Sequence, residues 1–155
     1  MIKRLSTAAG LLCAFALSAA AQAQPREPQD LVRSFYAEPN LYLSPARSSS
    51  YLAHDLDVAL KTPARPDEVG AIDFDYRYGA QDLEVSGLEL LQEVDNDQAR
   101  VVAVFKNFGK PQSVDWTLCR RADGDWRIAD AASNTGRDPW DLRVMLRLPA
   151  DRIRC

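Results

Sequence analysis

Residues 99–108 read ARVVAVFKNF, a run whose apolar side chains fall on both faces of an extended strand. Val101, Ala103 and Phe105 lie on one face, and Val102 and Val104 lie on the other, because side chains two positions apart along a strand share a face. A strand that is apolar on both faces is typical of the centre of a covered sheet. We therefore expect this stretch to be a central strand with a layer packed on each side.

Three further segments have a strand-like composition, and short turn-forming sequences connect them to residues 99–108. The strands are expected at 83–94, 113–121 and 126–128, with turns at 95–97, 109–111 and 123–124. Short turns join neighbouring antiparallel strands, so the pattern predicts a meander. Upstream, residues 71–77 alternate apolar and charged side chains, which indicates one more strand with a solvated face.

Three segments carry helical signals. The first, residues 31–38, has apolar side chains at helical spacing and stops before a proline. The second, 44–61, begins with Ser44 as N-cap ahead of a proline, and the third, 138–148, begins in the same way with Asp138. The expected fold class is α+β: N-terminal helices packed on a curved antiparallel meander sheet, with a short C-terminal helix.

The first 23 residues have the three parts of a cleavable export signal. Lys3 and Arg4 form a basic start, residues 11–17 form an apolar core, and small residues at 21–23 suit a signal peptidase. The core is too short to span a bilayer. We expect residues 1–23 to be removed and residues 24–155 to form a single domain, without a membrane span, in the periplasm or outside the cell.

Two cysteines remain after such cleavage, because Cys13 lies within the signal. Cys119 lies in an expected strand, Cys155 lies at the C-terminus, and in an oxidising compartment such a pair is expected to form a disulfide. The alternatives are a reactive thiol or an intermolecular link through Cys155.

The formal net charge is −3, and loss of the basic signal makes the rest of the chain more acidic. This charge argues against nucleic acid and anionic lipid as main partners. Carboxylates concentrate between residues 67 and 97, either as solvated strand faces or as an acidic docking surface. A series of four arginines, Arg143, Arg147, Arg152 and Arg154, would either dock an acidic partner or form a solvated face, because Arg143 and Arg147 lie one helical turn apart. Trp140 is either packed on the sheet or part of a contact surface.

No strong catalytic or metal signature is present. His54 follows no catalytic pattern, and its neighbour Asp55 points to another side of the helix, so we expect a surface histidine. One histidine and paired cysteines do not suggest zinc. Asp73 and Asp75 project to one strand face, where they would either pair with Arg77 or bind a cation. We therefore expect no catalytic, cofactor or metal-binding residues.

The order of elements and several motifs resemble a known family. The motifs that carry the resemblance are Phe35-Tyr36, Asp73-Phe74-Asp75, Gln81-Asp82, residues 101–105, Gly109, Trp126-Arg127-Ile128 and Asp130. Over residues 30–148 the chain resembles a family of small bacterial secreted proteins of unknown function. That family is similar in fold to the nuclear-transport-factor-two-like, or cystatin-like, cone-shaped α+β domains. The resemblance implies a pocket between helices and sheet, and it implies no catalytic residues.

Polar side chains that would line this pocket define a candidate site. They are Tyr36, Asp73, Asp75, Tyr78, Gln81, Asp82 and Asp130. In fold relatives an aspartate base and a tyrosine donor perform isomerase or dehydratase chemistry in such a pocket. That chemistry requires the carboxylates and phenols to converge in an apolar cavity.

Three classes of function are compatible with these features. The favoured hypothesis is an exported non-catalytic binding or accessory protein, which takes a small ligand or an envelope protein through the cleft or the outer sheet face. This hypothesis includes dimerisation across the outer sheet face. The second hypothesis is a cofactor-free isomerase or lyase that uses a pocket Asp and Tyr. The third is a secreted inhibitor or immunity-type protein, which would dock through the acidic stretch.

Overall fold

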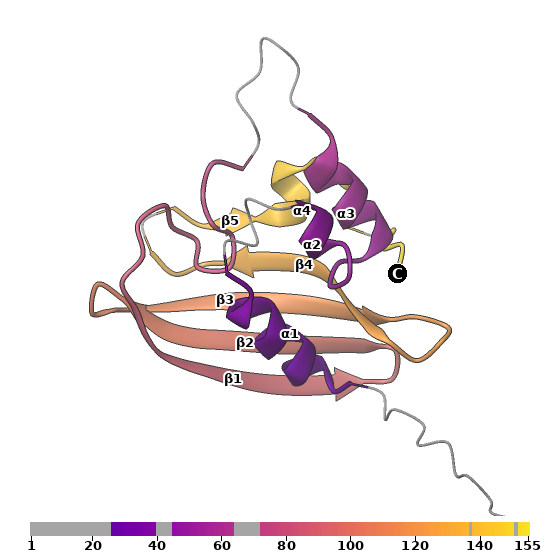
Figure 1. Cartoon of the computed structure of the whole chain (residues 1–155), viewed down its shortest axis with the longest axis horizontal. Helices are drawn as coiled ribbons and strands as arrows, with labels where there is room; N and C mark the ends of the chain where they lie inside the picture. The colour runs from indigo at the N-terminus through magenta and orange to yellow at the C-terminus, as the bar shows by residue number, and fades with distance from the viewer. Residues whose placement is uncertain (1–25, 40–44, 64–71, 137, 151) are drawn as a thin grey trace, which may run out of the picture.

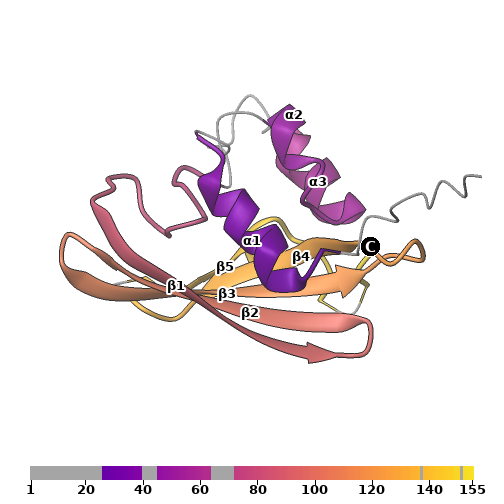
Figure 2. The same ribbon diagram turned by 60° about the horizontal axis from the view of Figure 1, so that its bottom comes forward.

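A computed structural model describes residues 26–39, 45–63, 72–136, 138–150 and 152–155. The expected signal peptide, residues 1–23, lies outside the described residues. Three helices lie on one side of a twisted antiparallel sheet (Figures 1 and 2). They are α1 (Pro28–Ala37), α2 (Pro45–Ser48) and α3 (His54–Lys61). The α+β class is therefore confirmed.

The sheet has the order β1-β2-β3-β4-β5, with every neighbouring pair antiparallel. The strands are β1 (Val85–Asp95), β2 (Gln98–Asn107), β3 (Lys110–Arg120), β4 (Trp126–Ser133) and β5 (Trp140–Asp141). Phe108 and Gly109 form the two-residue turn between β2 and β3, and both have positive φ, as the strand twist favours in such turns. Lys110 and Pro111 therefore begin β3 rather than forming the turn.

The face of β2 that points to the helices is buried, and the other face is only partly covered. Val101 and Ala103 are fully buried, whereas Val102 is half-buried and Leu91, its partner on β1, is 60 % exposed. The described part of the chain leaves this part of the sheet without a full second layer, and cover by a second subunit stays a prediction. On the partly covered side, Ala53 and the end of the chain, with Ile153 and Cys155, pack near Cys119.

Helix α1 supplies most of the cover for the buried face. Its residues Leu31, Val32, Phe35 and Tyr36 recur at helical spacing and are all buried. The ring of Phe35 meets the fully buried Trp116 of β3 edge to face, with centroids 5.4 Å apart. The helix ends before Pro39, because a residue that precedes proline disfavours helical backbone.

The predicted helix 44–61 is two helices, with a turn at 49–51 and non-helical backbone at Leu52 and Ala53 between them. The N–H of Ile128 donates to the carbonyl of Tyr51 at 2.8 Å, and the N–H of Ala53 donates to the carbonyl of Ile128 at 2.7 Å. Leu52 thus forms a parallel bridge with β4. The prediction of one helix is wrong because β4 has an edge whose buried backbone groups need partners. The proposed N-cap, Ser44, lies outside the described residues.

Residues 72–80 form a loop, so the predicted strand at 71–77 is wrong. The Asp75 carboxylate accepts a hydrogen bond from the Arg77 N–H at 3.0 Å, and such local bonds compete with strand formation. The ring of Trp140 packs on Phe74, with centroids 5.3 Å apart, and closes over Gly79. A Cβ at Gly79 would lie 2.7 Å from the Trp140 Nε1, so glycine is required there. The Trp140 side chain is therefore half-buried, with its ring packed on Phe74.

The C-terminal helix α4 (Leu142–Met145) is one turn long and begins later than predicted. Its N-cap is Asp141, whose side chain accepts from the Val144 N–H at 2.9 Å. Asp138 and Pro139 instead precede the short strand β5. The proline signal predicts a start there, but pairing of Trp140 with Ser133 of β4 extends the backbone first.

After α4 the chain returns to the sheet as a C-terminal tail, which we define as residues 148–150 and 152–155. Cys119 of β3 and Cys155 form a disulfide, with their Cα atoms 5.8 Å apart. This spacing is ordinary for disulfides. The bridge closes a loop with a sequence separation of 36 residues.

Reduction of this bridge is expected to lower the free energy of unfolding by up to about 4 kcal/mol, because the unfolded chain regains loop entropy. Urea denaturation with and without dithiothreitol measures the difference. The double variant Cys119→Ser/Cys155→Ser is the control, and its stability should not respond to dithiothreitol. Equal stability of the oxidised and reduced wild-type protein would contradict the expectation.

Candidate functional site

Aromatic side chains fill the space between α1 and the sheet, where the resemblance predicted a pocket. Trp116 lies at the centre and is fully buried. Phe35 and Tyr36 meet its ring edge to face, and Tyr78 meets Tyr36 and Phe105 in the same way, with centroids 5.3–5.8 Å apart. Such pairs stabilise a core beyond the burial of their area. This part of the molecule is a packed core.

Tyr36, the first predicted pocket residue, belongs to that core. Its hydroxyl donates a hydrogen bond to the Arg77 carbonyl at 2.6 Å and accepts one from the Trp116 Nε1 at 3.2 Å. Burial raises the pKa of Tyr36 well above its usual range. The phenol is therefore a neutral structural group whose donor and acceptor are both in use.

Asp75 is buried and pairs with Arg77, one of the two outcomes expected for it. The Arg77 Nη2 lies 2.7 Å from the Asp75 Oδ2, and both side chains are almost fully buried. The Arg77 Nη1 also donates to the carbonyls of Phe35 and Glu38, at the C-terminal end of α1. The ion pair thus satisfies helix-end carbonyls, which have no partner within the helix.

Of the other predicted pocket residues, Tyr78 lies with Tyr36, whereas Asp73, Gln81 and Asp82 lie at the surface. Tyr78 is half-buried beside Tyr36, and burial is the main cause that raises its pKa. Asp73, Gln81 and Asp82 are exposed. The Gln81 Nε2 donates to the Asp73 carbonyl at 3.2 Å, which holds the loop together at the surface.

Asp130 lies on the other face of the sheet from Tyr36. It pairs with Thr117, whereas the adjacent Ala131 pairs with Trp116 and faces the core. The Asp130 Oδ1 accepts from the backbone N–H groups of Ala131 and Arg143, at 2.8 and 3.1 Å. Burial, with a smaller contribution from Asp141, raises the pKa of Asp130 from 3.8 to about 6.

A groove lies elsewhere, between α3 and the C-terminal tail. Its volume is about 450 Å³. We call it the α3–tail groove, and its lining residues are His54, Asp55, Val58, Ala59, Thr62, Leu148, Pro149, Arg152 and Arg154. The α3 members are spaced by three or four positions and so form one stripe along the helix. The sequence predicted no pocket here, but it placed Arg152 and Arg154 in a series of arginines that would dock an acidic partner.

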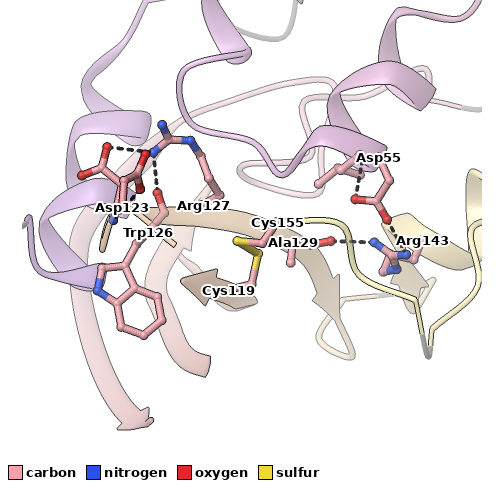
Figure 3. The surroundings of a disulfide bond; sticks show 10 residues. Asp55, Cys119, Asp123, Trp126, Arg127, Ala129, Arg143 and Cys155 are labelled. Atoms are coloured by element: carbon pink, nitrogen blue, oxygen red, sulfur yellow. Dashed lines mark hydrogen bonds and ion pairs between the residues drawn. A yellow bond between two sulfur atoms is a disulfide. The ribbon is translucent and has the colours of Figure 1, made fainter. Parts of the chain in front are cut away.

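Arg143 holds the two walls of the groove together. Its Nη2 lies 2.8 Å from the Asp55 Oδ2 and donates to the Pro149 carbonyl at 2.7 Å, while its Nη1 donates to the Ala129 carbonyl at 3.2 Å. Figure 3 shows Arg143 between Asp55 and Ala129, near the disulfide that anchors the tail. Arg143 is only 3 % exposed, so the prediction of a solvated face is wrong for it.

The groove has an apolar part and a cationic end. Val58 is 50 % exposed on α3, opposite Leu148 and Pro149. At the start of α3 the His54 N–H donates to the Arg154 carbonyl at 2.9 Å, which places the tail beside the helix. His54 is exposed, as predicted. A groove of this kind can hold a small molecule with an apolar body.

The part of the chain that the structure describes offers no group of three His, Cys, Asp or Glu side chains placed to hold a metal ion. Nor does any helix in the described ranges have the length and apolar character needed to cross a membrane. The acidic residues Glu89 and Glu93 lie exposed on β1, which is the edge strand of the sheet.

Comparison of the chain with protein-family models, curated proteins and solved structures gives no match. The resemblance to nuclear-transport-factor-two-like domains therefore stays a prediction. The structure supports the coarser description, an α+β fold with one open five-stranded antiparallel sheet.

Tyr36→Phe is expected to lower the free energy of unfolding by about 1–3 kcal/mol, because the buried Trp116 Nε1 and Arg77 carbonyl each lose a partner. Tyr78→Phe is the matched control, because no hydrogen bond of the Tyr78 hydroxyl is found among the described residues. Urea denaturation measures both variants. Equal stability of the two would show that the Tyr36 hydroxyl is not part of a structural network.

Asp130→Asn is expected to stabilise the protein at pH 7.5 and to leave it unchanged near pH 4. With a folded-state pKa of about 6 against 3.8, Asp130 contributes stability that is full below about pH 4 and is lost as the pH rises through 6. Asparagine keeps the acceptor oxygen and removes the charge. The expected gain is about 1 kcal/mol after allowance for partial exposure.

The measurement is the free energy of unfolding from pH 4 to pH 8. Asp82→Asn removes an exposed carboxylate and serves as the control. A gain for Asp130→Asn that is the same at every pH would contradict the assignment.

Proposed function

We propose that the protein is an exported, non-catalytic binding protein that holds a small, largely apolar ligand in the α3–tail groove. The observation that carries the proposal is the groove itself, whose volume of about 450 Å³ falls within the usual range for small-molecule sites. Val58 is half exposed there, and a ligand that covers this apolar surface gains free energy by removing it from water.

Export to the periplasm is supported by two features. The sequence of residues 1–23 has the composition of a cleavable signal, and Cys119 and Cys155 lie at disulfide distance. Disulfides persist in oxidising compartments and are rare in the cytosol. The expected homodimer across the outer sheet face stays a prediction.

The isomerase or lyase hypothesis has less support from the geometry. A catalytic base must reach the substrate with a free carboxylate. Asp75 is buried against Arg77, and Asp130 lies on the opposite face of the sheet from the Tyr36 phenol. The groups named for that chemistry thus do not share an open cavity.

Native mass spectrometry of the protein, purified gently from its own envelope fraction, tests the proposal. We expect a bound small molecule that denaturation releases. We also expect the mass of a mature chain that starts at Gln24. The variant Val58→Asp should lose the ligand, because it places a charge in the apolar part of the groove.

Val144→Asp is the matched control. Val144 is 71 % exposed and lies outside the groove lining, so this variant should keep the ligand. A ligand that survives Val58→Asp as well as Val144→Asp would refute the groove as its site. A protein that carries no small molecule would favour a protein partner instead.

A further inference from the structure

The lining of the α3–tail groove carries an excess of positive charge. Among the described lining residues Asp55 is the one side-chain carboxylate, and it pairs with the buried Arg143 at 2.8 Å. Arg152 and Arg154 also line the groove. The chain as a whole has a net charge of −3, so the groove differs in sign from the rest of the molecule.

Arg154 is the cation best placed to meet a ligand. Its backbone carbonyl accepts from the His54 N–H at 2.9 Å, which fixes its position at one end of the groove. Its side chain is exposed, and among the described residues its guanidinium makes no ion pair. An arginine guanidinium is suited to bidentate binding of carboxylate and related oxyanions.

The apolar part of the groove continues along α3 from this cationic end. From His54 to Thr62 the helix covers about 12 Å, at about 1.5 Å per residue. Val58 and Ala59 line one side over this distance, and Leu148 lines the other.

We propose that the ligand is a free single-chain amphiphilic anion, such as a medium-chain alkyl carboxylate. Its chain lies along Val58, Ala59 and Leu148, and its anionic group lies at Arg154. The inference rests on the proposed binding function of the groove and adds the charge and shape of the ligand. A short concave groove suits a free molecule, whereas a bilayer surface requires a broad exposed face.

Three probes that carry the same alkyl chain separate the contribution of charge to affinity from that of apolar burial. They are octanoate, 1-octanol and octyltrimethylammonium. Each is titrated into the ¹⁵N-labelled protein and followed by NMR. We expect octanoate to shift amides of α3 and the tail, and to bind about tenfold more tightly than 1-octanol. Octyltrimethylammonium should bind most weakly, because like charges at Arg154 repel it.

The variant Arg154→Gln should weaken octanoate binding about three- to tenfold and leave 1-octanol binding unchanged, because only octanoate uses the guanidinium. Arg33→Gln is the control, since Arg33 is an exposed arginine on α1 outside the groove. Its octanoate affinity should equal that of the wild type.

The outcomes distinguish failure of the inference from failure of the proposed function. Equal binding of octanoate and 1-octanol in the groove would overturn the anionic ligand and leave the groove as a binding site. Absence of groove shifts with all three probes would overturn both. Binding to phosphatidylglycerol vesicles, without groove shifts by octanoate, would overturn the choice of a free amphiphile.

Discussion

The buried guanidinium of Arg143 is the constraint on which the groove and the tail depend. A buried charge is tolerated only when it is paired and hydrogen-bonded, so the groups around Arg143 must stay in place. Asp55 comes from α3, Ala129 from β4 and Pro149 from the tail, and all three contact the same side chain. The disulfide between Cys119 and Cys155 then holds the end of the tail to β3.

Arg77 performs a related role in the other half of the molecule, with an opposite consequence for function. Its pairing with Asp75 and its bonds to the end of α1 draw the loop at 72–80 against the helix. The aromatic side chains close the space that remains, so the groups of the predicted pocket become part of the core. Arg143, by contrast, binds α3 through Asp55 and the tail through the Pro149 carbonyl, and these two elements form the walls of the groove.

The two arginines also differ in how many of their guanidinium nitrogens have a hydrogen-bond acceptor. Arg77 directs its Nε and both terminal nitrogens to acceptors. The Nε of Arg143 is buried without a hydrogen-bond partner among the described residues. An unpaired buried donor costs free energy, and the tight contacts of the two terminal nitrogens must offset it.

The meander could be predicted from the sequence, because the apolar run at residues 99–108 and the short turns between strands are local signals. Helix α1 and the pairing of two cysteines also followed from local spacing and count. Contacts in the folded chain place Leu52 beside β4, choose Arg77 over a cation as the partner of Asp75, and bring Arg143 to Asp55. Asp55 and Arg143 are far apart in the chain, and no periodic pattern relates them. The groove therefore exists only through pairing of distant residues, which local propensity does not encode.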